Sequence, residues 1–263
     1  MAEIMKKLFT INKAPYSVQC LLYAEGYTSV HRVIIYCHGF GGHKETKAAM
    51  HFADYVIAGH KDVAVVCFDW PCHGDDVRKQ LSLDDCDAYL RIITSYAKET
   101  LGAEEVFLYA TSFGGYLTLK YIMDHGIPWE KVALRCPAVH MSEVLEQSIM
   151  TEENSALLAE GRDALVGFDR KIKVSPEFLH ALQDADITGT SYLNHADKML
   201  ILHGTKDEIV SFDAVRQFAD KNRIRFVPVE NADHRFIDPG KMEEAIQLFE
   251  EFLLSSQQAE CEK

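Results

Sequence analysis

The chain has 263 residues, 48% of them apolar, so it can bury a substantial core. Its length fits either one α/β domain with an insertion or two small domains. The 27 Lys and Arg residues stand against 40 Asp and Glu residues, a formal charge of −13. Because this acidic excess repels phosphate backbones and anionic bilayers, we expect neither nucleic acid nor a membrane surface as a partner.

Short apolar runs alternate with amphipathic stretches along most of the chain. An extended segment at residues 4–24 predicts a hairpin, and the later runs read RVIIYC, VAVVCF, EVFLYA, KVALRC, KMLILH and IRFVPV. Most are rich in β-branched residues and too short for helices, so they predict strands. The stretches between them predict helices at 47–58, 83–101, 115–124, 212–221 and 241–254. This alternation is typical of a mostly parallel sheet with helices on both faces.

The interval from Val139 to His195 breaks the alternation. It is polar, mostly helical in pattern, and shows no convincing strand. A structureless loop of this length is rare inside a compact domain. We therefore predict an inserted helical cap at 139–195, between a first core part at 1–138 and a second core part at 196–263.

The seven cysteines form no CxxC pair and no cluster with zinc spacing, so we interpret them as reduced thiols. No ligand cluster or dinucleotide motif indicates a metal or an organic cofactor. The N-terminal segment MAEIMKKLFT lacks the apolar stretch of a signal peptide, and no later segment has the length of a membrane span. We therefore expect a cytoplasmic protein without membrane insertion.

The segment EVFLYATSFGGYL predicts a strand that turns abruptly into a helix, with Ser112 at the turn. Such a turn projects its side chain outward in strained geometry and requires small neighbours, here Ala110, Gly114 and Gly115. The alternative is that Ser112 only caps the following helix, as serines often do. The five-residue pattern alone does not decide between a nucleophile and a cap.

Three further motifs favour the nucleophile. The glycines of YCHGFGGHK, which directly follows a predicted strand, allow the amide of Phe40 to form an oxyanion hole with the amide of Phe113. In LILHGTKDEIV, Asp207 follows a late strand and is placed to orient a histidine. In VPVENADHRF, His234 follows the last strand and is placed to exchange a proton with Ser112. Each motif also has a non-catalytic interpretation. These are an ordinary glycine turn, a solvated carboxylate and a histidine without a catalytic role.

The chain order Ser112, Asp207, His234 resembles that of the α/β-hydrolases, with alanine in place of the first glycine of GxSxG. The resemblance covers nearly the whole chain outside the cap and implies an α/β-hydrolase fold. Asp233 is the reserve acid. The segment VCFDWPCHGDD is similar to a DxxGHG stretch of small-cap esterases, and there we expect Asp69 and His73 to brace loops rather than to react.

Within this superfamily the chain most resembles small-cap cinnamoyl and feruloyl esterases and monoacylglycerol lipases. The resemblance implies a serine carboxylesterase that forms an acyl-enzyme on a small to medium ester of hydroxycinnamate or monoglyceride type. The cap would roof the pocket, so Phe168, Phe178 and Tyr192 are candidate substrate contacts, with packing inside the cap as the alternative. Asp186 aligns with a cap acid that engages a phenolic hydroxyl in cinnamoyl esterases.

Other functions fit the same fold. A peptidase or amidase uses the same triad, and an acyltransferase passes the acyl group to an alcohol other than water. A noncatalytic binding protein of this fold commonly lacks a triad residue or the oxyanion glycines, all of which are present here. A small ester is the expected partner, and the oligomeric state is left open, a homodimer included.

Overall fold

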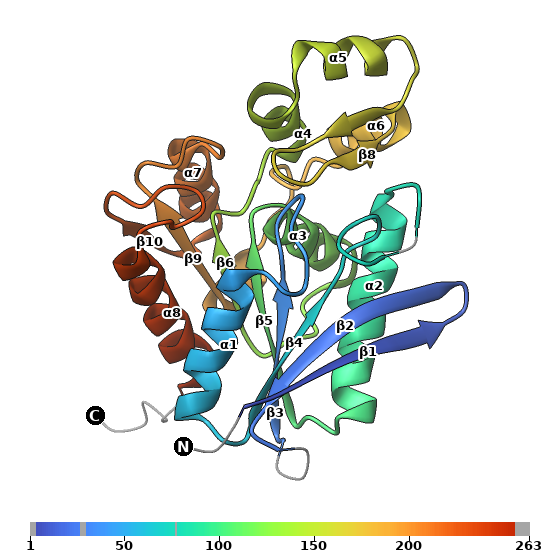
Figure 1. The fold of residues 1–263 in the computed structure, drawn as a ribbon. Helices are drawn as coiled ribbons and strands as arrows, with labels where there is room; N and C mark the ends of the chain where they lie inside the picture. The colour runs from blue at the N-terminus through green and yellow to red at the C-terminus, as the bar shows by residue number, and fades with distance from the viewer. Residues whose placement is uncertain (1–3, 27–29, 77, 256–263) are drawn as a thin grey trace.

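The computed structural model describes residues 4–26, 30–76 and 78–255 (Figure 1). Within these residues, eight strands form one sheet in the order β1-β2-β4-β3-β5-β6-β9-β10. Strand β2 pairs antiparallel with β1 and with β4, and the remaining neighbours pair in parallel. The strands are β1 (Met5–Lys13), β2 (Tyr16–Ala24), β3 (Arg32–Cys37), β4 (Val63–Phe68), β5 (Glu105–Thr111), β6 (Val132–Arg135), β9 (Met199–Gly204) and β10 (Arg225–Val229). The predicted α/β-hydrolase architecture, a mostly parallel sheet with helices around it, is confirmed.

Helices cover both faces of this sheet. The core helices are α1 (Lys47–Gly59), α2 (Leu83–Ser95), α3 (Phe113–His125), α7 (Phe212–Asn222) and α8 (Pro239–Leu254). The long helix expected at 83–101 is α2 followed by a π-helical turn, η1 (Tyr96–Thr100). Side chains of α1 and α8 pack in one hydrophobic layer, and those of α2, α3 and α7 pack in the other.

The strands supply both layers by alternation. In β5, Leu108 and Ala110 belong to the layer with α2 and α3, whereas Phe107 and Tyr109 belong to the layer with α1 and α8. A strand buried on both faces carries apolar residues at every position, which explains the unbroken apolar runs in the sequence. The same rule places Thr111, the last residue of β5, on the α1 and α8 side.

Residues 141–184 of the 139–195 interval lie above the C-terminal ends of the strands in Figure 1, and the rest of the interval returns along the core to the strand that begins at Met199. Its elements are α4 (Met141–Val144), η2 (Leu145–Ile149), α5 (Glu152–Ala159), β7 (Ala164–Val166), β8 (Ile172–Val174), α6 (Pro176–Asp184) and η3 (Leu193–Lys198). Strands β7 and β8 pair antiparallel in a separate small sheet. The expectation that this interval contains no strand was therefore wrong. Three-residue strands such as ALV and IKV are too short to show an alternating pattern.

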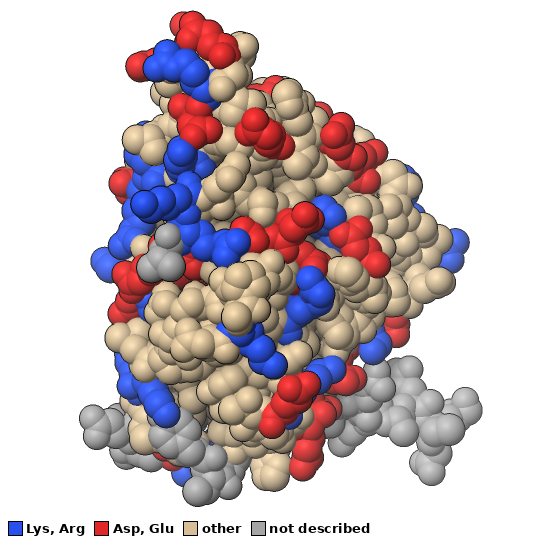
Figure 2. All heavy atoms as spheres, turned by 90° about the vertical axis from the view of Figure 1, so that its right-hand side faces the viewer, with Lys and Arg blue, Asp and Glu red and all other residues tan. Residues whose placement is uncertain are grey.

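Charge is unevenly distributed over the surface. On the face in Figure 2, Lys and Arg side chains gather along the left edge of the upper half, while Asp and Glu are spread more widely. None of the helices in the described part of the chain is long and apolar enough to span a membrane.

Candidate active site

Ser112 occupies the sharp turn between β5 and α3. Its backbone has φ 53° and ψ −117°, a conformation that a residue with a side chain rarely adopts. The start of α3 packs closely on the chain at the end of β3. A Cβ at Gly114 would lie 2.7 Å from the carbonyl oxygens of Cys37 and His38. The Ser112 side chain makes no capping hydrogen bond to α3. The helix-cap alternative therefore does not describe this serine.

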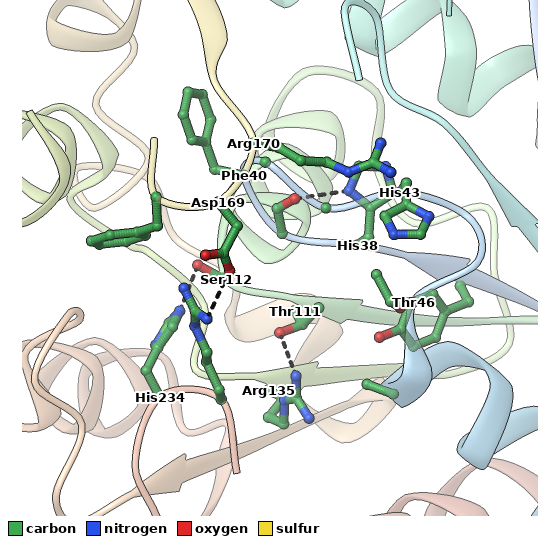
Figure 3. A pocket seen from close by; sticks show the side chains of 17 residues that line it. His38, Phe40, His43, Thr46, Thr111, Ser112, Arg135, Asp169, Arg170 and His234 are labelled. Carbon is green, nitrogen blue, oxygen red and sulfur yellow. Dashed lines mark hydrogen bonds and ion pairs between the residues drawn. The ribbon is translucent and has the colours of Figure 1, made fainter. Parts of the chain in front are cut away.

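The hydroxyl of Ser112 instead faces His234 (Figure 3). Its Oγ lies 3.0 Å from His234 Nε2, and His234 Nδ1 lies 2.7 Å from Asp207 Oδ2. Since a carboxylate only accepts hydrogen bonds, Nδ1 carries the ring hydrogen and Nε2 is left to accept from the Ser112 hydroxyl. The three residues predicted from distant segments thus form one continuous chain of hydrogen bonds.

The side chain of Asp207 is fully buried, and every contact to its carboxylate is a donor. Oδ1 accepts from the backbone amides of Ile209 and Val210, at 2.9 and 2.8 Å. Oδ2 also lies 3.2 Å from Nε2 of the buried His203, which is 3.1 Å from the Val210 carbonyl and therefore carries a hydrogen. Burial alone would raise the pKa of Asp207, but the hydrogen bonds from His203, His234 and the Val210 amide hold this pKa well below its usual range.

The neighbouring acid takes no part in this chain. Asp233 Oδ1 accepts from the amide of Ile237 at 3.1 Å, so the reserve acid is used to shape its own loop. His203 was missed by the sequence reading, although it lies only four residues before Asp207. Nothing in the string LHGTKD distinguishes a histidine that donates to the acid from an ordinary strand residue.

The loop after β3 lies directly against the nucleophile. A Cβ at Gly39 would be 3.2 Å from the Ser112 Cβ, a tight contact that glycine avoids. The Gly39 carbonyl accepts from His38 Nδ1 at 2.8 Å and from the Gly42 amide at 3.0 Å. Because N–H and C=O point in opposite directions across a trans peptide, the Phe40 amide is directed away from that pair. Among the described residues, no protein acceptor takes up the Phe40 amide.

His38 fixes this peptide and is a second residue that the sequence reading missed. Its Nε2 accepts from the Trp70 amide at 3.3 Å, which places the ring hydrogen on Nδ1. Burial holds the pKa of His38 well below its usual range, so the ring stays neutral and the tautomer stays fixed. The Phe113 amide, the other expected donor, is the first amide of α3, which a helix leaves without an internal acceptor.

Asp69 and His73 are buried away from the triad. Asp69 accepts from the Lys44 amide at 2.7 Å and from the Asp75 amide at 2.9 Å, and its carboxylate pairs with the Lys44 ammonium at 3.0 Å. His73 Nδ1 contacts the Pro71 carbonyl at 2.9 Å. These contacts tie the loop after β4 to the loop after β3, as expected of bracing residues.

A cavity of about 360 Å³ opens beside Ser112 and His234. The loop at 38–43 and Thr46 form one part of its wall, Thr111 and Arg135 form another, and residues 168–170 of the cap interval with Arg235 complete it. Asp169 and Arg235 form an ion pair at 3.4 Å at this wall. The charged residues of this wall were not predicted as site residues from the sequence: Arg135, Asp169, Arg170 and Arg235.

Of the four residues expected to contact a substrate, only Phe168 borders this cavity. It is 48% exposed, and the Arg235 guanidinium lies 5.4 Å from its ring centre. Phe178 is buried between the cap and the core, with its ring 6.4 Å from that of Phe113.

Tyr192 and Asp186 also lie elsewhere. Tyr192 is buried, donates from its hydroxyl to the Leu119 carbonyl at 3.2 Å and packs on Phe218. Asp186 accepts from the amide and hydroxyl of Thr188, at 2.8 and 2.6 Å, and borders a different hollow. Phe178, Tyr192 and Asp186 therefore do not border this cavity, because core packing and a local turn occupy their side chains.

Two groups of side chains in the described part of the chain have the spacing that a metal ion needs. One is Cys136, His203 and Asp207, where His203 and His234 already donate to the carboxylate. The other is the exposed group Asp87, Asp124 and His125, in which His125 contacts Asp87 at 2.7 Å. In both groups the carboxylate oxygens are engaged by protein donors.

Comparison with known proteins agrees with this fold. The model of the α/β hydrolase family matches residues 34–245, which is most of the chain. The chain belongs to the α/β-hydrolase family. At the level that this family describes, the protein is a hydrolase. A search of curated proteins found no significant match.

Solved structures share the fold of this α/β-hydrolase at low identity. A structure of Est1E from Butyrivibrio proteoclasticus with ferulic acid bound has a TM-score of 0.75 and 18% identity, covering 94% of this chain and 98% of its own. A putative hydrolase from Agrobacterium vitis has a TM-score of 0.75 and 16% identity, with coverage of 95% and 99%. Alpha/beta hydrolase domain-containing protein 10 from mouse has a TM-score of 0.67 and 16% identity, with coverage of 93% and 97%.

Proposed function

We propose that this α/β-hydrolase is a serine-dependent carboxylic ester hydrolase that works through an acyl-enzyme. The observation that carries the proposal is the unbroken chain from Asp207 through His234 to a strained, uncapped Ser112 beside a cavity. A serine hydroxyl is a weak nucleophile on its own, and an adjacent base that is oriented by a third group activates it.

In the proposed mechanism, Ser112 Oγ attacks the ester carbonyl while His234 Nε2 takes its proton. The negative charge of Asp207 stabilises the imidazolium that forms, and its hydrogen bond keeps the ring in the correct tautomer. The amides of Phe40 and Phe113 hold the oxyanion, because both belong to segments that pack against Ser112. His234 then gives the proton to the leaving alcohol, and water releases the acyl group by the same steps in reverse.

The cap interval belongs to this proposal as the roof of the site. Its residues Phe168 and Asp169 reach the cavity wall, which supports a role of the inserted unit predicted at 139–195 in covering the site. A cavity of about 360 Å³ suits a small to medium ester. The fold shared with Est1E supports hydroxycinnamate esters as one arm of a substrate test, whereas the position of Asp186 does not provide the phenol contact expected of such an enzyme.

A cytoplasmic location is also part of the proposal. The six cysteines in the described part of the chain are all unpaired, and five of them are buried. Unpaired buried thiols are typical of proteins in reducing compartments.

A panel of substrates tests the proposed reaction. It should contain short-chain and long-chain esters, a monoglyceride, a hydroxycinnamate ester and aminoacyl anilides, each assayed with the wild type and with Ser112→Ala. We expect ester hydrolysis that depends on Ser112. Turnover of the anilides in preference to every ester would replace the esterase proposal with a peptidase.

A further inference from the structure

A buried arginine lies at the wall of the same cavity. Arg135, the last residue of β6, is only 5% exposed. Its Nη2 donates to Thr111 Oγ1 at 3.2 Å, and its Nη1 contacts the Met242 sulfur at 3.2 Å. Figure 3 shows the guanidinium turned toward Thr111, one residue from the nucleophile, with Thr46 across from it.

This guanidinium is incompletely matched by the protein. Its Nε has no hydrogen-bond acceptor, and no carboxylate lies within ion-pair distance, among the residues that the structure describes. A guanidinium offers five N–H donors, and the contacts of Arg135 with the described residues use two of them, one on a weakly accepting sulfur. The ring of Phe236, 5.2 Å away, adds a cation–π contact, and the carboxylate of Asp207 acts on the guanidinium only from beyond ion-pair distance.

Burying a charge without a partner is unfavourable by several kcal/mol, and an apolar side chain of similar volume is often the more stable choice. The neighbours Met242 and Phe236 would accept such a side chain. A structural role therefore explains the position of Arg135 poorly, whereas a ligand that brings its own negative charge explains it well.

The rest of the cavity points to the same kind of ligand. Arg170 and Arg235 also border it, and the only carboxylate among its described lining residues is Asp169. The Asp169 side chain is 89% exposed and pairs with Arg235, and among the described residues neither Arg135 nor Arg170 has a carboxylate in direct ion-pair contact. A cationic cavity in a chain of charge −13 is opposite in sign to the whole protein, and it attracts anions locally.

We propose that Arg135 binds a carboxylate carried by the substrate, so that the enzyme prefers esters whose acyl or alcohol part ends in a carboxylate. The planar guanidinium matches a carboxylate through parallel N–H donors, and the cavity links this group to Ser112. The inference rests on the proposed ester hydrolysis and adds the class of ester.

Two matched pairs of substrates test it. Methyl hydrogen glutarate is compared with methyl glutaramate, and butyryloxyacetate is compared with butyryloxyacetamide. Each pair exchanges a carboxylate for an uncharged amide of nearly the same shape. We expect kcat/KM to favour the acid at least about tenfold in one pair, since hydrogen bonds to charged groups have this strength.

Variants separate binding from structure. Arg135→Met should abolish the preference by lowering kcat/KM for the acid toward that for its amide, and Arg135→Lys should retain part of the preference. Arg216→Met is the matched control, because Arg216 lies on α7, pairs with Asp213 and packs over Phe212. It should keep both the preference and the neutral activity.

Two results overturn the inference: equal kcat/KM within both pairs for the wild type, or a preference that survives Arg135→Met. If Arg135→Met does not fold, competitive inhibition of the wild type by butyrate against butyramide replaces it, and equal inhibition overturns the inference. Neutral esters that are hydrolysed without any preference leave the proposed function standing. Failure to hydrolyse any ester, together with an unreactive Ser112, removes the proposed function itself.

Discussion

Replacing Asp207 by Asn is the sharpest test of how the acid acts. The Asn carbonyl can still accept from the amides of Ile209 and Val210, so the loop should keep its shape. The amide nitrogen would then face Nδ1 of His234 and Nε2 of His203, both of which donate to the carboxylate. Two charge-assisted hydrogen bonds, each about 1.5–3 kcal/mol, would be lost.

The loss should appear in kcat. A sum of about 3–6 kcal/mol corresponds to roughly 10²- to 10⁴-fold in rate. We expect a loss near 10⁴-fold, because Asn favours the His234 tautomer that carries its hydrogen on Nε2. In that tautomer Nε2 cannot accept the Ser112 proton. Asp-to-Asn changes in such triads lower kcat about 10⁴-fold. Steady-state hydrolysis of one ester with a chromogenic leaving group measures it, with circular dichroism to confirm folding.

Asp233→Asn is the matched control. Asp233 is adjacent to His234 but accepts from the Ile237 amide, so its variant should keep kcat within about twofold. A folded Asp207→Asn variant with near wild-type kcat would refute the role assigned to the acid. A large loss in Asp233→Asn alone would transfer that role to Asp233.

Three further predictions concern the supports of the site. His203→Phe removes one donor to Asp207 and should lower kcat about tenfold without changing the number of reactive serines, measured by active-site titration. Gly114→Ala places a Cβ 2.7 Å from two carbonyl oxygens and should lower the free energy of unfolding by about 1–3 kcal/mol in urea titrations; an unchanged value would contradict the packing described. Burial lowers the pKa of His73 to about 4, whereas in the unfolded chain it is about 6.5. Below pH 6.5 the unfolded chain therefore binds a proton that the folded chain does not, and stability falls as the pH falls. Between pH 6.5 and 5 this histidine should lower the free energy of unfolding by about 1.6 kcal/mol, and His73→Gln should flatten the pH dependence accordingly.

The central strands β3 and β4 were predictable because each is a short β-branched run buried on both faces. The predicted runs RVIIYC and VAVVCF coincide with β3 and β4. The meeting of Ser112, Asp207 and His234 followed from the same pattern, because the ends of parallel strands share one edge of the sheet.

The pocket was not predictable in the same way. Tyr192 and Phe168 are both cap aromatics in sequence, but packing buries one and leaves the other at the cavity, and that choice depends on tertiary contacts. Arg135 ends the apolar run KVALRC and reads as the margin of a strand. Only the folded chain shows that its side chain, Arg170 and Arg235 line one cavity from three separate segments.

The central claim is that Ser112 is made nucleophilic by His234, and covalent labelling tests it most directly. A fluorophosphonate should add once per chain to the wild type, and mass spectrometry of the digested protein should place the adduct on Ser112. Ser112→Ala and His234→Ala should remain unlabelled under the same conditions. An adduct on another residue, or equal labelling of Ser112→Ala, would contradict the account.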